Sequence, residues 1–326
     1  MAHELTTNSN GQREFFYTGK KPWHGLGQKL EGPATSADAI AAANLGWTVS
    51  KRGILTMDGF NCDDFAAVVR DDNNKVLSVM KKSYKPIQNH EAFAFFDSVV
   101  GAGAAVFETA GSIFDGKRVF LVAKLPTAIF ATPNDRIEQY LTLMNTHDGS
   151  SALRMYFTPI RVVCNNTLMA SLRGMKDCVS IQHSGNIGFK IKEAQDALGL
   201  ANNYFKSFEE IVSTLVQKQT DAKMVDEFLK DLFKPAKTSD KNAAAEMSKQ
   251  AQKKIIQVKA NLECDPKNTM EGIHGTMWAL WNAVAQFGDH ESRSVAGSAD
   301  NRMNSIMNGF SADLKQEAFD KLLTLV

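Results

Sequence analysis

Cysteine is scarce in this sequence. Only four of the 326 residues are cysteines, and none forms a C-x-x-C pair or has a histidine at metal-ligand spacing. They are Cys62, Cys164, Cys178 and Cys264. This pattern excludes a disulfide framework and a zinc-finger type of site, and we expect reduced thiols in a cytosol-like compartment.

Long apolar runs and an excess of charge are missing as well. No run approaches the ~20 residues that span a bilayer, and the polar start MAHELTTNSNGQRE does not resemble a signal peptide. Lys and Arg number 37 against 36 Asp and Glu, a formal net charge of +1. Neither half is therefore a basic module, and a nucleic-acid surface has to be a local patch. We expect a cytoplasmic protein without a membrane partner.

What is present is ample apolar material, 44% of the residues, arranged first as strands and then as helices. Segments 47–57, 65–70 and 76–80 predict a three-stranded meander, with a hairpin turn at 71–74. Further strands are expected at 104–110, 118–124, 137–146, 152–157 and 178–183. Helices are expected at 35–44, 90–100, 190–217, 221–233, 241–262, 270–287 and 304–325.

Strands in runs followed by helices in runs predict an α+β fold. We expect an antiparallel, curved β-sheet with packed helices in the first half and a mainly helical second half. The predicted parts are a polar N-terminal arm at 1–34, an α+β sheet domain at 35–188 and a helical domain or extension at 189–326.

A central segment at 150–174 joins these halves. Its strand-like start at 153–157 leads into Thr158-Pro159, a cap and first-turn pair that predicts a helix up to Gly174. The alternative is that 160–164 continues the strand.

In that alternative, Asn165 or Asn166 caps a shorter helix. In the helical version Arg161, Asn165 and Asn166 lie in or beside apolar packing, where each polar group needs a partner. Apolar packing does not account for these three residues, so they are candidates for a role in function.

Three stretches resemble one family in order and spacing. They are PWHGLG at 22–27, RVVCNNTL at 161–168, and a segment from GTMW at 275–278 to DHE at 289–291. Together they are similar to the phage/plasmid-like protein family, domain of unknown function 932, over roughly residues 15–325. The resemblance implies a phage, prophage or plasmid origin and a bacterial cytoplasm. It implies no activity, and the Arg-rich stretch expected after 289–291 is reduced to Arg293.

Catalytic and metal chemistry find little support in the residues. Cys164 as a nucleophile, with His147 or His24 as its base, competes with a buried thiol among apolar neighbours, which we favour. Asp289-His290-Glu291 cannot converge on a metal from a helix, because consecutive residues point about 100° apart. We assign no catalytic residue, no metal and no cofactor.

More residues of the sequence support nucleic-acid binding. Lys81-Lys82-Ser83-Tyr84-Lys85 places three cations and one aromatic ring on a loop, which suits a groove that follows a phosphate backbone and stacks bases. For each basic stretch taken alone we favour a solvated face balanced by nearby acids such as Asp71 and Asp72, and only the stretches together favour binding. The full candidate set is Lys20, Lys21, Trp23, Lys81, Lys82, Tyr84, Lys85, Arg154, Arg161, Asn165 and Asn166. A second basic face is expected at Lys249, Lys253, Lys254 and Lys259.

These expectations favour a mobile-element protein that binds single-stranded DNA and assists annealing or recombination without hydrolysis. By analogy with annealing proteins of such architecture, we expect a homo-oligomer in the form of a ring or filament. Two alternatives stay open. One is a factor that binds or modulates a host protein through the helical half, and the other is an enzyme of unrecognised type that uses the central segment.

Overall fold

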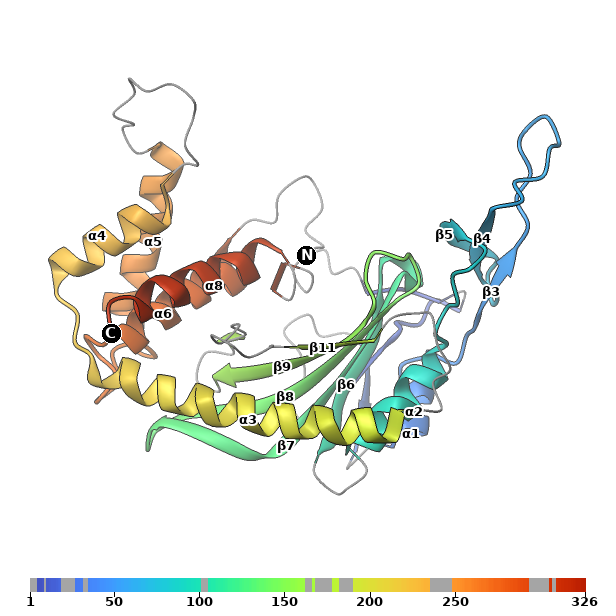
Figure 1. Cartoon of the computed structure of the whole chain (residues 1–326). Helices are drawn as coiled ribbons and strands as arrows, with labels where there is room; N and C mark the ends of the chain where they lie inside the picture. Colours follow the sequence, from blue (N-terminus) through green and yellow to red (C-terminus); the bar gives the residue numbers. More distant parts are fainter. Residues whose placement is uncertain are drawn as a thin grey trace. The chain divides into compact units, whose positions relative to one another are not determined.

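The computed structural model describes residues 5–8, 10–18, 27–31, 35–100, 105–161, 166–167, 178–181, 190–234, 248–292, 305–306 and 309–326. The chain forms two compact units (Figure 1). The first contains Met1–Thr127, Gln139–Thr158 and Lys176–Asn203. The second contains Ala128–Glu138, Pro159–Met175 and Tyr204–Val326.

One sheet has eight strands in the order β10-β9-β8-β7-β6-β1-β2, with β11 also paired to β9. Its strands are β1 (Phe15–Thr18), β2 (Gln28–Leu30), β6 (Val106–Ile113), β7 (Arg118–Thr132), β8 (Asp135–Thr146), β9 (Leu153–Arg161), β10 (Asn166–Thr167) and β11 (Cys178–Ile181). The ladders β1–β6, β6–β7, β9–β10 and β9–β11 are antiparallel, whereas β1–β2 is parallel. The predicted α+β class with an antiparallel-rich sheet is confirmed.

The sheet also takes in a part of the chain that we expected to be a polar arm. Phe15, Phe16 and Tyr17 of β1 are buried, and β1 lies between β6 and β2, with Phe16 opposite Ala110. Four residues are too few for a periodic pattern to stand out among polar flanks. The strand is stabilised by the apolar side chains that it buries in the sheet.

The predicted meander is confirmed as a separate three-stranded sheet in the order β3-β4-β5. Its strands are β3 (Val49–Arg52), β4 (Phe65–Arg70) and β5 (Lys75–Lys81). Two short helices belong to the same unit, α1 (Ser36–Ala42) and α2 (Asn89–Val100). Thr35 and Asp38 form the capping box that starts α1.

The helix predicted to begin at Thr158 is wrong in its first turn. Strand β9 continues through Pro159 to Arg161, and β10 folds back on it with Asn166 opposite Arg161. Thr158 and Ile160 are β-branched, and the φ of proline is also compatible with extended backbone, so the strand alternative was correct at this point. Residues 162–165 and 168–177, which include Cys164, Asn165 and Gly174, lie outside the described residues.

Helices dominate the second half, as predicted. They are α3 (Lys190–Gln217), α4 (Ala222–Leu232), α5 (Lys249–Cys264), α6 (Met277–Gln286), the π-helix η3 (Phe287–Glu291) and α8 (Phe310–Leu323). Helix α6 starts later than the predicted residue 270, because Thr276 caps it by accepting a bond from Ala279 N at 3.1 Å. No helix in the described ranges is long and apolar enough to cross a bilayer.

Helix α6 is the core of the second unit. Every residue from Met277 to Gln286 is buried, and Trp278 and Trp281 have no exposed surface. The Trp281 ring lies 4.8 Å from that of Phe319 in α8 and 6.0 Å from that of Phe208 in α3. The two tryptophans are therefore core residues rather than an exposed seam.

Candidate nucleic-acid interface

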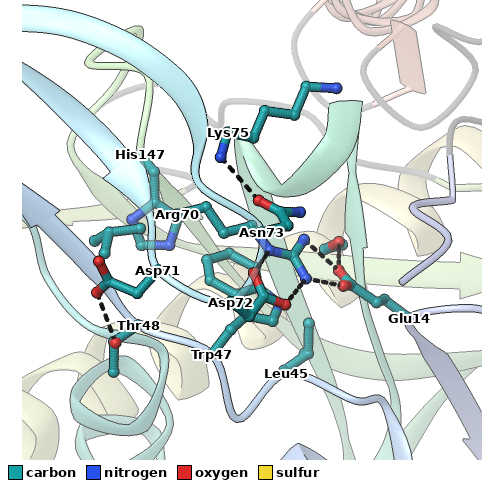
Figure 2. A network of polar contacts seen from close by, with 12 residues as sticks. Glu14, Leu45, Trp47, Thr48, Arg70, Asp71, Asp72, Asn73, Lys75 and His147 are labelled. Carbon is teal, nitrogen blue, oxygen red and sulfur yellow. Dashed lines mark hydrogen bonds and ion pairs between the residues drawn. The ribbon is translucent and has the colours of Figure 1, made fainter. Parts of the chain in front are cut away.

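The best-defined polar site in the first unit surrounds Arg70, at the end of β4 (Figure 2). Its side chain is about 1% exposed. Nη1 donates to Glu14 Oε2 at 3.2 Å, and Nη2 forms an ion pair with Glu14 Oε1. Nε and Nη2 donate to the two carboxylate oxygens of Asp72 at 2.7 and 2.8 Å. The guanidinium lies 4.1 Å from the centre of the Trp47 ring, in cation–π geometry.

These contacts explain how a buried charge is tolerated. Burial by itself lowers the pKa of Arg70, but hydrogen bonds to Asp72 and Glu14 outweigh it and hold that pKa above its ordinary value. Glu14 has no exposed side-chain surface and also accepts a bond from Ser112 Oγ in β6. The network therefore joins β4 of the small sheet to the β1 and β6 region of the large sheet.

The turn between β6 and β7 is shaped to this network. Gly116 has φ +94°, and a Cβ atom built on it meets Arg70 Nη1 at 2.9 Å and the Trp47 ring at 3.2 Å. Glycine alone combines this backbone conformation with such a close approach. Replacement of Gly116 would push against the guanidinium and the indole together.

His147, one of the two histidines that we considered as a base for Cys164, is part of the same framework. It is buried, its ring packs against the Trp47 ring at 5.3 Å, and its Nε2 donates to Asn89 Oδ1 at 3.0 Å. Asn89 Nδ2 in turn donates to the carbonyl oxygens of Leu45 and Trp47 at 3.0 and 3.3 Å. These contacts hold the loop before β3, the start of α2 and the β8–β9 turn together.

The loop that carries most of the predicted DNA-binding residues begins at the end of β5. Tyr84 is half-buried and its hydroxyl donates to the carbonyl oxygen of Thr146 in β8 at 3.2 Å. Burial, with a smaller contribution from Asp148, raises the pKa of Tyr84 to about 12. Lys81, Lys82 and Lys85 are exposed on either side of it. Tyr84 thus anchors the loop to β8 while the lysines face solvent.

A fourth lysine joins this loop from β3. Lys51 Nζ donates to the carbonyl oxygen of Lys82 at 2.6 Å. Lys82 is 3.8 Å from the exposed Asp63, whereas Lys81 and Lys85 form no ion pair with any described residue. We call Lys51, Lys81, Lys82 and Lys85 the lysine cluster.

An aromatic ring that we had not selected lies beside the lysine cluster. Phe65 is 43% exposed and stands directly opposite Lys81 in the β4–β5 ladder. Residues opposite one another in such a ladder have Cβ atoms only about 5 Å apart. From the sequence we placed Phe65 in a strand and gave it no role. The pairing with Lys81 was available only from the register.

The other described residues of the predicted set belong to strands β9 and β10. Lys20, Lys21, Trp23 and Asn165 lie outside the described residues. Arg161 and Asn166 are paired through the β9–β10 backbone, and Arg154 is in β9 opposite Ser180 of β11. Among the described residues of the predicted set, Lys81, Lys82, Tyr84 and Lys85 share one loop.

The second basic face, on α5, is partly occupied by internal contacts. Lys254 lies 5.8 Å from the Phe233 ring centre and 5.2 Å from that of Phe310, and Lys259 pairs with Asp226. Lys249 and Lys253 are exposed. Two of the four lysines therefore remain available to a partner.

The Asp289-His290-Glu291 motif forms part of the π-helix η3. Asp289 is buried and accepts bonds from Lys315 Nζ at 2.8 Å and from Ser311 Oγ at 2.5 Å. Burial lowers the pKa of Lys315 despite the opposing effect of Asp289. Across the described parts of the chain, no group of three or more His, Cys, Asp or Glu residues is placed to hold a metal.

The fold and this site define an α+β protein with a lysine-rich edge on a small sheet. The chain belongs to the family described as a domain of unknown function (DUF932), whose match covers residues 76–308. The family resemblance seen in the sequence is confirmed, and the phage or plasmid origin stays a prediction. No curated protein and no solved structure matches the chain.

Proposed function

We propose that the protein binds single-stranded DNA through the lysine cluster and assists annealing or recombination without hydrolysis. The observation that carries this proposal is the position of the exposed Phe65 ring opposite Lys81, at the end of β5 where the loop with Lys82 and Lys85 begins. Cations that follow a backbone, next to a ring on which a base stacks, are the shared features of sequence-independent single-strand binding.

The charges at the site support a phosphate ligand. Lys81 and Lys85 have no acidic partner among the described residues, and the 3.8 Å contact of Lys82 with the exposed Asp63 is long. Exposed ion pairs of this kind contribute little and are easily exchanged for another anion. Four cations within one short stretch of surface therefore offer several phosphate contacts at little cost in lost pairs.

The Arg70 network supplies the rigidity that such a site needs. It ties the end of β4 to Glu14 and Ser112, while Tyr84 ties the lysine loop to β8. A surface held by buried contacts orders few side chains on binding, which keeps the entropic cost of complex formation low.

The test is a fluorescence anisotropy titration of a labelled oligo(dT) over a salt series. Each phosphate contact with a single strand contributes about 0.7 to the slope of log affinity against log salt. The double variant Lys81→Glu/Lys82→Glu is expected to lower the magnitude of that slope by about 1.4 and to weaken binding at every salt concentration.

The matched control is Lys206→Glu/Lys218→Glu, which reverses two exposed lysines that form no ion pair with any described residue. Its affinity and slope are expected to stay close to those of the unmodified protein. If both double variants lose the same affinity, the effect is one of general charge and the proposed site is wrong. No binding by the unmodified protein at ~50 mM salt would reject the function itself.

Stacking is tested at Phe65. Phe65→Ala is expected to weaken binding by roughly 1–3 kcal/mol without changing the salt slope, whereas Phe65→Trp retains binding. A strand-annealing assay with two complementary labelled oligonucleotides, without nucleotide cofactor, completes the test. Annealing at the uncatalysed rate would leave binding alone as the function.

A further inference from the structure

The connection between β3 and β4 forms a hairpin that projects from the small sheet (Figure 1). We call residues 53–64 the finger. Thr56 N donates to Phe60 O at 2.8 Å, and Cys62 N donates to Ile54 O at 2.9 Å. Gly59, with φ +83°, closes the turn by donating its N–H to Thr56 O at 2.9 Å. The finger is therefore a hydrogen-bonded ribbon with a defined tip.

The finger exposes large apolar side chains. Leu55 is 63% exposed, Phe60 is 72% exposed and Met57 is fully exposed at 105%. Single exposed apolar residues are ordinary, but three of them on one short ribbon make the ribbon a candidate interaction surface. This surface is unusual in lying on a projection rather than in a groove.

The negative charge of the finger limits the kind of partner that it can bind. The finger sequence GILTMDGFNCDD carries Asp58, Asp63 and Asp64 and no Lys or Arg. Such a segment is repelled by a phosphate backbone and by an anionic membrane surface. Its partner must be a protein surface with an apolar centre and cations around it.

The exposed face of α5 has this composition. Lys249, Lys253 and Ile256 follow one another at intervals of four and three residues, which places them on one side of the helix. Ile256 is 66% exposed, while Val258 and Leu262 are buried on another side. An apolar residue thus lies beside two free cations.

A pocket between α4 and α8 of the second unit is a poorer partner for the finger. The pocket has a volume of about 420 Å³, with Phe228, Met224 and Leu325 as its apolar part. The same pocket carries Asp221, Glu227 and Asp231 together with Lys223 and Lys321, and Lys321 pairs with Asp231. Its charges are mixed, with one more acid than lysine, so it suits the acidic finger less well than the α5 face does.

We propose that the finger of one copy docks on the α5 face of a second copy. Because the two surfaces differ, the contact is heterologous, and it extends head to tail into a ring or a filament. A hairpin tip buries far less than the ~800 Å² per partner of a standard interface. The association is therefore weak and depends on protein concentration.

The test measures the mass of the full chain by sedimentation velocity between ~1 and ~100 μM, without nucleic acid. The unmodified protein is expected to increase in mass with concentration. Asp58→Lys and Lys253→Glu each place like charges in contact and are expected to weaken association about tenfold. Asp196→Lys and Lys206→Glu, which reverse exposed charges on α3, are the matched controls and keep the original behaviour.

Combinations of these variants identify the contact. Asp58→Lys/Lys253→Glu in one chain restores opposite charges and recovers the assembly. In an equimolar mixture of the two single variants, each finger meets the α5 face of the other variant with opposite charges, so the mixture also recovers the assembly although neither variant does so alone.

Three results would overturn the proposal. They are a constant monomer mass up to ~100 μM, single variants that associate like the unmodified protein, and a mixture that associates no more than the single variants do. Docking of the finger on its own chain gives the first and the third. The proposal is independent of DNA binding, because the Lys81→Glu/Lys82→Glu variant is expected to associate normally.

Discussion

Removal of one partner from the Arg70 network should cost the first unit much of its stability. In Glu14→Gln the guanidinium keeps Asp72 and the Trp47 ring but loses a buried carboxylate that contacts both of its terminal nitrogens. Breaking a buried ion pair by removing one partner typically costs about 3–5 kcal/mol. A domain has only about 5–15 kcal/mol of stability in total.

Urea unfolding followed by tryptophan fluorescence and by circular dichroism measures the effect. With a slope of about 3 kcal/mol per molar urea, a loss of 3–5 kcal/mol lowers the midpoint by roughly 1–1.7 M. Trp47 belongs to the network, whereas Trp278 and Trp281 report on the second unit. The shift is expected in the transition that Trp47 reports, and Trp47→Phe, which removes that fluorescence signal, identifies the transition.

Two variants separate the charge pair from packing. Asp72 is 37% exposed, so Asp72→Asn is expected to cost less than Glu14→Gln, about 1–2 kcal/mol. Glu14→Gln/Arg70→Met removes both buried charges and should recover part of the loss, because no uncompensated cation remains. Equal costs for Glu14→Gln and Asp72→Asn, or a double variant less stable than either single one, would refute the reasoning.

Two further predictions concern stability. Because burial lowers the pKa of Lys315, the unfolded chain binds more protons than the folded chain as pH approaches 10.5. The free energy of unfolding should therefore rise with pH between the lowered pKa and 10.5. Urea titrations at several pH values measure this rise, which should be absent from Asp289→Asn/Lys315→Met. Gly116→Ala should destabilise the protein by about 2–3 kcal/mol, because it adds backbone strain and a 2.9 Å contact with Arg70. Gly59→Ala, where φ is positive but the space around the new Cβ is open, should cost only about 1 kcal/mol. Equal shifts in thermal unfolding for the two variants would contradict the steric part of this reasoning.

Elements with strong local signals were predictable. Strand β4 at Phe65–Arg70 and helix α3 at Lys190–Gln217 have the predicted limits, because apolar spacing and flanking polar residues are sufficient there. The start of the predicted helix at Thr158 was wrong, since the capping signal of Thr158-Pro159 is local and the ladder with β10 is not. At this position the long-range pairing of β9 with β10 outweighs the local helix-start signal.

The site was predictable only in its surface residues. The lysine loop is visible as a run of cations, but the pairing of Phe65 with Lys81 depends on register. Glu14 and Arg70 are 56 residues apart, and both are charged types that are ordinarily exposed. Their burial follows from the docking of one sheet on another, which no local pattern encodes.

Strand β1 has a consequence for the order of events during synthesis. Its antiparallel partner β6 ends at Ile113, and Ser112 is 98 residues beyond Glu14. At a synthesis rate of about 5–20 residues per second, β6 is completed roughly 5–20 seconds after β1 has been synthesised. Until then Phe15, Phe16 and Tyr17 have no partner strand to pair with. During that interval an apolar segment is open to chaperones and to neighbouring nascent chains. The step that closes the sheet over β1 is therefore the point at which folding of this chain competes with aggregation.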